Sequence, residues 1–237
     1  MKNNLTEKDI ETLNKFGLEI NDKEKIFNIK KLNISNDEIK YIPTEFFKLI
    51  NLEELFIYCR SLRKLPKEIG NLTNLKELYI DCKSLRKLPK EVGNLINLKE
   101  LSINRDDLTE LPKEIGNLIN LKKLYIDCKS LRKLPEDIKN LINLKRLKIS
   151  CYDLELTRKI GNIINLETLY IWSDVDGLIE LPKEIGNLTN LKMLDIKCNN
   201  LKELPKEIYN LINLKALYIM SDNLESFPDG IERLTNL

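Results

Sequence analysis

The chain has 237 residues, and its 39 basic and 37 acidic side chains leave a formal net charge of only +2. This balance excludes a strongly positive field over the whole molecule, and an apolar fraction of 42% is too high for a disordered chain. The sequence contains no apolar run long enough to span a membrane, and it contains no histidine, the commonest general base. We therefore expect no catalytic residue, no metal site and no cofactor.

The first 28 residues differ in pattern from the rest and predict a short amphipathic helix. Thr6 and Asp9 have the spacing of a capping box, with Asp in place of Glu. Apolar residues follow at helical spacing, and Gly17 provides a stop. We expect residues 1–28 to form an N-terminal helical cap over the open end of the core.

The same segment lacks the apolar stretch of a secretory signal peptide. This favours a cytoplasmic location, in which the cysteines are reduced thiols. A secreted or surface location is the less favoured alternative.

From residue 29 to the end of the chain, one interval recurs. The eight prolines share one phase and are mostly 23 residues apart, and Thr157 takes the proline slot inside the single gap of 47. With the first apolar residue of each expected strand as position 1, residues 29–237 divide into nine repeats that start at 29, 52, 75, 98, 121, 144, 166, 191 and 214. Positions 1, 4, 6, 11, 14, 18 and 21 hold Leu, Ile, Val or Phe in every repeat.

Each repeat predicts a short strand, then a turn and one or two helical turns. The proline suits the first helical position, because its missing N–H group loses no hydrogen bond there. One such unit cannot bury its own apolar edge. Stacked units can, with their strands side by side in one parallel sheet at about 4.8 Å per step.

Two polar positions also recur. Position 23 is Asn in all nine repeats, and position 19 is Gly in five of them. Asn tolerates left-handed backbone and can bond its own turn, so we expect it at the corner that enters each strand. The glycines are expected at another tight corner, at Gly70, Gly93, Gly116, Gly161 and Gly186.

The repeat LKMLDIKCNNLKELPKEIYNL at residues 191–211 resembles the leucine-rich repeat family, and the half LPxxIGNLxxL resembles its typical 23-residue class. The resemblance implies an α/β fold. In this fold a curved solenoid carries a parallel β-sheet on its concave face and short helical or 3-10 segments on its convex face. It also implies that a protein partner binds on the concave face. The family asparagine at position 9 survives only as Asn199, so we do not expect the usual amide ladder there to be complete.

Two irregularities interrupt the period. The repeat that starts at residue 144 is one residue short, and the next carries two extra residues within Trp172–Leu178. We expect a local bulge or a change of curvature there. The sequence stops at the first leucine of a tenth strand, so we expect no C-terminal cap, and the uncovered apolar end predicts self-association.

Strand positions 5 and 7 are expected to point away from the core, onto the concave face. They hold seven of the 15 aromatic residues with two aspartates between them: Phe56, Tyr58, Tyr79, Asp81, Tyr125, Asp127, Tyr170, Trp172 and Tyr218. Tyr and Trp offer large contact area at low entropic cost and dominate binding hot spots. These nine residues are the candidate partner-binding site. The alternative is that aromatic residues favour strands and pack against their cross-strand neighbours.

All five cysteines stand at position 8. The pairs Cys59/Cys82 and Cys128/Cys151 fall in adjacent repeats, a separation that permits a disulfide by Cα distance alone. The favoured interpretation is a small residue that fills the strand-end corner. The two pairs lie too far apart to form one zinc site.

A basic flank follows three of the strands, at residues 60–64, 83–87 and 129–133. An acidic or phosphate-rich partner would be attracted to it. Solvation of a loop face is the favoured interpretation, and we expect no specific nucleic-acid partner and no membrane partner.

These observations and the resemblance predict a non-catalytic protein–protein interaction module or scaffold. Two alternatives stay open: the substrate-recognition part of a larger enzyme, such as a ubiquitin-ligase-type effector, and an exported or surface bacterial binding protein. The sequence does not identify the partner.

Overall fold

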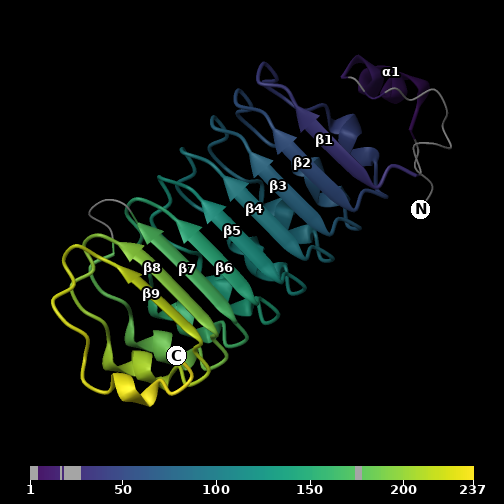
Figure 1. Ribbon diagram of the computed structural model, residues 1–237. Coiled ribbons are helices and arrows are strands. Elements are labelled where there is room, and N and C mark those ends of the chain that lie inside the picture. The colour runs from purple at the N-terminus through teal and green to yellow at the C-terminus, as the bar shows by residue number, and fades with distance from the viewer. Residues whose placement is uncertain (1–4, 17, 19–27, 174–177) are drawn as a thin grey trace.

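The computed structural model describes residues 5–16, 18, 28–173 and 178–237 (Figure 1). Nine strands form one sheet in the order β1 to β9, and each strand pairs in parallel with the next. Figure 1 shows that the strands are similar in length and direction and form one elongated stack, with α1 beyond β1 at one end and the C-terminus at the other. The strands are β1 Lys31–Ser35, β2 Glu54–Tyr58, β3 Glu77–Asp81, β4 Glu100–Asn104, β5 Lys123–Asp127, β6 Arg146–Ser150, β7 Thr168–Ser173, β8 Met193–Cys198 and β9 Ala216–Met220.

A 3-10 helix follows each strand and lies on the other side of the stack (Figure 1). The predicted solenoid, with a parallel sheet on one side and short 3-10 segments on the other, is therefore confirmed. The 3-10 helices are η1 Thr44–Lys48, η2 Lys67–Asn71, η3 Lys90–Asn94, η4 Lys113–Asn117, η5 Glu136–Asn140, η6 Arg158–Asn162, η7 Lys183–Asn187, η8 Lys206–Asn210 and η9 Ile231–Arg233.

One continuous apolar core runs through the stack. The register aligns each strand position with the same position of its neighbour, so that Leu55 lies beside Leu78 and Ile57 beside Ile80. These four side chains are at most 1% exposed. The recurring apolar positions thus stack into ladders that no single repeat could bury alone.

The prolines lie one residue before the expected position. Pro66 precedes η2 with φ −60° and ψ 144°, and its carbonyl accepts a hydrogen bond from the Ile69 N–H at 3.2 Å. The prediction that the proline is the first helical residue was therefore wrong by one residue. With an extended ψ the proline is not itself helical, and it caps the helix that starts at the next residue. Thr157 does the same in the repeat without proline, with φ −77°, ψ 158° and a bond from the Ile160 N–H at 3.1 Å.

The position-19 glycines serve close packing rather than a tight corner, so that prediction was wrong. Among the described glycines only Gly230 has a positive φ. Gly116 lies inside η4, and a Cβ atom built on it would stand 2.4 Å from the Asp137 carbonyl oxygen in η5. Gly70, Gly93, Gly161 and Gly186 show the same approach, with 2.2–2.8 Å to a backbone oxygen of the next helix. Consecutive coils can stack this closely because no side chain stands between their backbones.

The position-23 asparagines form a ladder between coils. Asn120 Nδ2 donates to the Ile96 carbonyl at 2.8 Å, which joins its coil to the preceding one. No described residue other than glycine has a positive φ, so the expected left-handed backbone was wrong. The same bond to the preceding repeat is made by Asn74, Asn97, Asn143, Asn165, Asn190, Asn213 and Asn236.

The expected N-terminal helix is α1, Glu7–Lys15. Its capping box is present: Thr6 Oγ1 accepts from the Asp9 N–H at 3.2 Å, and the Asp9 carboxylate accepts from the Thr6 N–H at 2.7 Å. The expected stop at Gly17 lies outside the described residues. Leu13 is fully buried, and Lys48 of η1 donates to Asp9 Oδ1 at 2.8 Å.

We propose that residues 1–28 cap the N-terminal end of the core, with α1 packed on η1. Burial alone would raise the pKa of the Asp9 carboxyl, but hydrogen bonds from Lys48 and Thr6 outweigh burial and lower it. The carboxylate therefore adds stability above its unfolded-state pKa, and this is lost as the pH falls through the folded-state pKa.

The capping box gives the first testable prediction. Thr6→Ala is expected to lower the free energy of unfolding by about 1 kcal/mol at neutral pH, because the Asp9 N–H loses its acceptor. Urea unfolding would measure the loss. Lys15→Ala, at an exposed position of the same helix, is the control and should change stability little. Equal stability of both variants would contradict a packed and capped α1.

The two irregular regions are only partly described. The expected bulge in Trp172–Leu178 falls largely on residues 174–177, which lie outside the described residues. On either side of this gap, β7 extends to Ser173, and Leu178 is buried. At the far end, β9 pairs with β8 alone among the described strands, and its inward residues Leu217 and Ile219 are only partly buried.

Candidate partner-binding face

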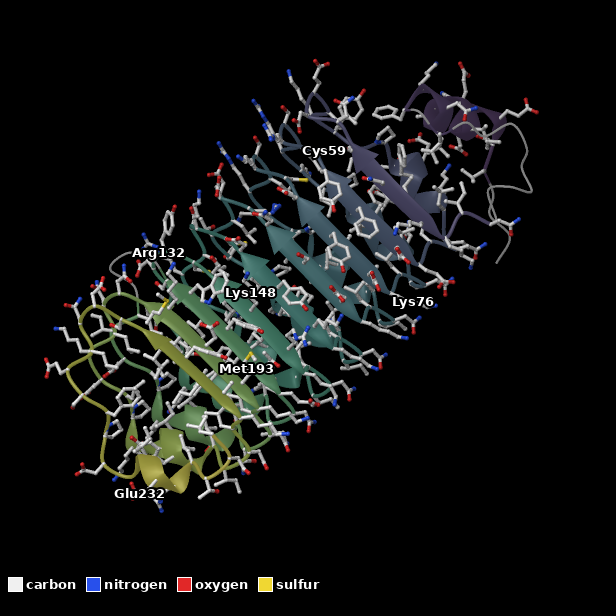
Figure 2. The ribbon with its side chains drawn as sticks, viewed as in Figure 1. Cys59, Lys76, Arg132, Lys148, Met193 and Glu232 are labelled. Atoms are coloured by element: carbon white, nitrogen blue, oxygen red, sulfur yellow. The ribbon has the colours of Figure 1, made fainter. Side chains whose placement is uncertain are left out.

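The outward side chains at positions 3, 5 and 7 of β1–β9 make up what we call the strand face. Figure 2 shows side chains, several of them aromatic rings, that stand over the strands on this side. The register places Phe56 beside Tyr79, Tyr79 beside Ser102, and Ser102 beside Tyr125. All nine candidate residues predicted from the sequence therefore lie on one face, in two rows that cross the strands.

Three of them form an aromatic cluster near the N-terminal end. The rings of Phe56 and Tyr79 are stacked, with centroids 4.7 Å apart and planes 8° apart. Tyr58 stands 6.5 Å from Phe56 and is 39% exposed. Lys31 Nζ lies 4.7 Å from the Phe56 ring centroid, so a cation of the chain already covers this ring.

A second cluster lies on β6–β8. Tyr170 and Trp172 meet edge to face at 6.4 Å, and Lys148 Nζ stands 3.9 Å above the Trp172 ring. The indole N–H of Trp172 points to Asp195 at 3.4 Å. Lys148 and Met193, both labelled in Figure 2, belong to this part of the face. Lys148 stands at position 5 of β6 and was not among the nine candidate residues.

Position 3 of the strands was missed as part of the face. Tyr79 donates its hydroxyl proton to Glu100 at 2.6 Å, and Tyr170 donates to Met193 Sδ at 3.3 Å. Arg146 interacts with the Tyr125 hydroxyl, and this raises the pKa of Arg146. In each case a position-5 tyrosine leans to position 3 of the next strand. Because side chains alternate between the two faces of a strand, position 3 must lie on the same face as positions 5 and 7, and this could have been inferred from the sequence.

The nine candidates do not form one unbroken patch. Within the described residues, neither Tyr125 nor Tyr218 has a ring contact with either cluster. Tyr218 is 57% exposed on β9, and Asp127 is exposed on β5. The alternative explanation, packing against cross-strand neighbours, applies directly to the stacked Phe56 and Tyr79.

The five cysteines are buried free thiols. Cys82 Sγ donates to the Ile57 carbonyl at 3.7 Å, and Cys128 Sγ donates to the Ile103 carbonyl at 3.9 Å. Burial raises the pKa of both thiols to about 12, which makes them poor nucleophiles. The described part of the chain contains no group of three or more His, Cys, Asp or Glu placed to hold a metal ion.

Position 8 also contains a residue that the sequence analysis overlooked. Arg105 stands between Cys82 and Cys128 in this row, and it is 1% exposed. Its Nη1 donates to the Leu85 carbonyl at 2.7 Å, while Nε and Nη2 have no hydrogen-bond partner. Burial lowers the pKa of Arg105 to about 10. The sequence feature that could have identified this residue is an arginine at a position that holds mainly small residues in the other repeats.

The basic flank is partly neutralised by the chain itself. Arg60 pairs with Asp37 at 3.4 Å, and Lys129 pairs with Asp106 at 3.1 Å. Lys87 pairs with Glu110 at 3.1 Å. Exposed pairs of this kind contribute little to stability. They do reduce the positive field that an acidic partner would meet. Among the described helices, none is long and apolar enough to cross a membrane.

Several solved structures are similar to this chain. Internalin C2 from Listeria monocytogenes is 21% identical, with a TM-score of 0.61 over 86% of this chain and 83% of that one. The leucine-rich repeat domain of the type III effector XopL is 26% identical, with a TM-score of 0.59 over 83% and 70%. A TDR receptor is 21% identical, with a TM-score of 0.70 over 90% of this chain but only 38% of the receptor. At 21% identity the likeness shows the fold alone.

Sequence comparison adds a family. No curated protein is significantly similar to the chain. A family model described as a leucine-rich repeat region matches residues 9–109, 87–177 and 174–237, which together cover most of the sequence. The chain therefore belongs to the leucine-rich repeat family.

Proposed function

We propose that this protein is a non-catalytic interaction module or scaffold that binds a protein partner through its strand face. The family supports protein binding in general. The choice of face is supported mainly by one observation, that seven of the 15 aromatic residues project from the same side of a single sheet. Aromatic side chains that are already held by stacking lose little entropy when a partner covers them.

The length of the face suits a large contact. Nine strands at about 4.8 Å spacing give a surface roughly 40 Å long, which is enough for an interface of standard size. Tyr58 and Tyr218 are the aromatic residues of the strand face most open to solvent, at 39% and 57% exposure. They lie seven strands apart, on β2 and β9, so a partner that covers both would span most of the sheet.

A triple substitution tests the face. Tyr79→Ser, Tyr125→Ser and Tyr170→Ser together are expected to weaken partner binding by about thirtyfold or more, because a single hot-spot truncation costs about 2 kcal/mol. Affinity capture from the native host would identify the partner, and titration calorimetry would measure the change. The matched control is Tyr41→Ser, because Tyr41 is 70% exposed but lies outside the strand face. Unchanged affinity of a folded triple variant would discard this surface.

The proposal has one rival of a different class, in which this solenoid selects substrates for a larger enzyme. The likeness to a leucine-rich repeat domain of a type III effector supports it. The rival uses the same face and differs in whether the natural reading frame also encodes a catalytic domain. The other alternative, an exported or surface bacterial binding protein, would be separated by cell fractionation.

We further propose a cytoplasmic location, supported by five free thiols that are not paired in disulfides. Self-association through the open edge of β9 stays a prediction. The exposed Tyr218 and Met220 on β9, at 57% and 63%, support it.

A further inference from the structure

The row of large side chains at position 5 is interrupted on β4. Tyr79 and Tyr125 are separated in the register by Ser102, whose side chain is small and partly exposed. We call the space above Ser102, between these two tyrosines, the Ser102 gap. Two strand steps put the tyrosines about 9.6 Å apart.

The stacked pair beside the gap shows what one step accommodates. Phe56 and Tyr79 lie one strand apart, and their rings stack at 4.7 Å with nearly parallel planes. Because one face of Tyr79 is against Phe56, its other face is turned toward β4 and Ser102. A flat group above Ser102 would lie one strand step from Tyr79 on one side and one strand step from Tyr125 on the other.

The strands around the gap are strongly acidic. β3, β4 and β5 carry four carboxylates on the strand face and a single cation, Lys123. That cation is bonded to Glu100 at 2.8 Å, and Glu100 also accepts the Tyr79 hydroxyl. Within the described residues the other three carboxylates, Glu77, Asp81 and Asp127, have no ion-pair partner. Arg105 follows β4, but it is buried, so it reduces the negative field without occupying the face.

The chain itself shows that this face accepts cations over its rings. Lys31 covers Phe56 at 4.7 Å, and Lys148 covers Trp172 at 3.9 Å. Among the described residues, no cation is stacked in this way over Tyr79 or Tyr125. The rings of Tyr79 and Tyr125 are thus open to a cation from a partner, although Arg146 reaches the Tyr125 hydroxyl from β6.

We propose that the Ser102 gap receives an arginine side chain of the protein partner, an inference that rests on the proposed function. The guanidinium is planar and fits between two rings, whereas an ammonium is a compact point charge. Asp81 and Asp127 flank Asn104 in the register and lie at the position-7 side of the gap. They supply the carboxylate oxygens that a guanidinium fork binds best.

A small probe tests the site without knowledge of the partner. The full chain, labelled with 15N, is titrated with N-acetyl-arginine amide at constant ionic strength. Saturable shifts are expected in the backbone amides of β3–β5. N-acetyl-lysine amide should bind at least about fivefold more weakly, and N-acetyl-citrulline amide, which is planar but uncharged, should not saturate. Equal binding of citrulline and arginine, or no saturable shift with arginine, would overturn the proposal.

Substitutions in and around the gap test whether the arginine probe binds there. Ser102→Tyr continues the row of tyrosines on β3 and β5, and it should abolish the arginine shifts while the thermal midpoint stays close to that of the parent. The control, Asn33→Tyr, adds the same ring at position 5 of β1 and should leave them unchanged. The pair Asp81→Asn and Asp127→Asn should weaken binding about tenfold by removing the charges. Arginine shifts that persist in Ser102→Tyr would place the binding elsewhere and refute the proposal.

The same variants separate this inference from the proposed function. A captured partner that depends on the three tyrosines but binds Ser102→Tyr as well as the parent would refute the arginine site and leave the strand face intact. Arginine binding in the gap, with no protein partner lost in the triple tyrosine variant, would show that the gap binds arginine but would refute both the strand face as the partner site and a partner arginine as the occupant.

Discussion

Gly116→Ala is expected to destabilise the solenoid by about 1–3 kcal/mol, although alanine is the better helix former. The new Cβ would stand 2.4 Å from the Asp137 carbonyl oxygen and 2.7 Å from the Asp137 Cβ. These atoms belong to the backbone and first side-chain carbon of η5, so neither can move aside as the end of a flexible side chain would. The coils must separate locally, which also loosens the neighbouring ladders.

Urea unfolding followed by circular dichroism would measure this loss. The control is Lys139→Ala, at the same repeat position in η5, where a Cβ is already present. Lys139 is exposed, so its truncation should change stability little. If Gly116→Ala proved as stable as Lys139→Ala, the coils would not be held by close backbone approach.

Arg105→Met is expected to stabilise the protein by about 1–4 kcal/mol, the range seen when buried ion pairs are replaced by apolar residues of similar size, because Arg105 is buried without even an ion-pair partner among the described residues. The guanidinium has two nitrogens without a hydrogen-bond partner, and each unsatisfied buried donor costs about 1–3 kcal/mol. The variant loses one bond, from Nη1 to the Leu85 carbonyl at 2.7 Å. A carbonyl without a partner costs less than the orphaned N–H groups of Nε and Nη2, so the balance favours methionine.

Two further substitutions complete this test. Arg105→Cys introduces the residue found at this position in the repeats on either side, Cys82 and Cys128, and measures how much the aliphatic stem of the arginine contributes by packing. Arg63→Cys removes an exposed arginine and should leave stability within about 0.5 kcal/mol of the parent. A lower thermal midpoint for Arg105→Met would mean that the buried guanidinium is a net stabilising group.

Much of the fold is readable from periodicity. The constant spacing of apolar residues predicts strands in register, and the structure pairs Leu55 with Leu78 and Tyr79 with Ser102 as that spacing requires. The capping box at Thr6 and Asp9 is equally local, because both hydrogen bonds join residues three apart. The membership of the strand face follows from the same alternation.

Contacts between coils could not be predicted in the same way. A repeating glycine indicates that a side chain is excluded, but not whether a turn or a neighbouring backbone excludes it, and Gly116 shows that it is the backbone of η5. The asparagines likewise bond the preceding coil, and the tyrosine hydroxyls bond position 3 of the next strand.

The sequence by itself determined which recurring apolar side chains are buried and which strands are neighbours, because the burial of these positions and the register depend on a constant interval. Tertiary structure alone decided how far apart the coils lie and that Arg105 is enclosed. It also decided that, among the described residues, Glu100 is paired with Lys123 while Asp81 and Asp127 beside the Ser102 gap have no ion-pair partner. These properties depend on distances between residues about one repeat apart in sequence. Those distances depend on the length and direction of the side chains, which cannot be inferred from the repeat interval.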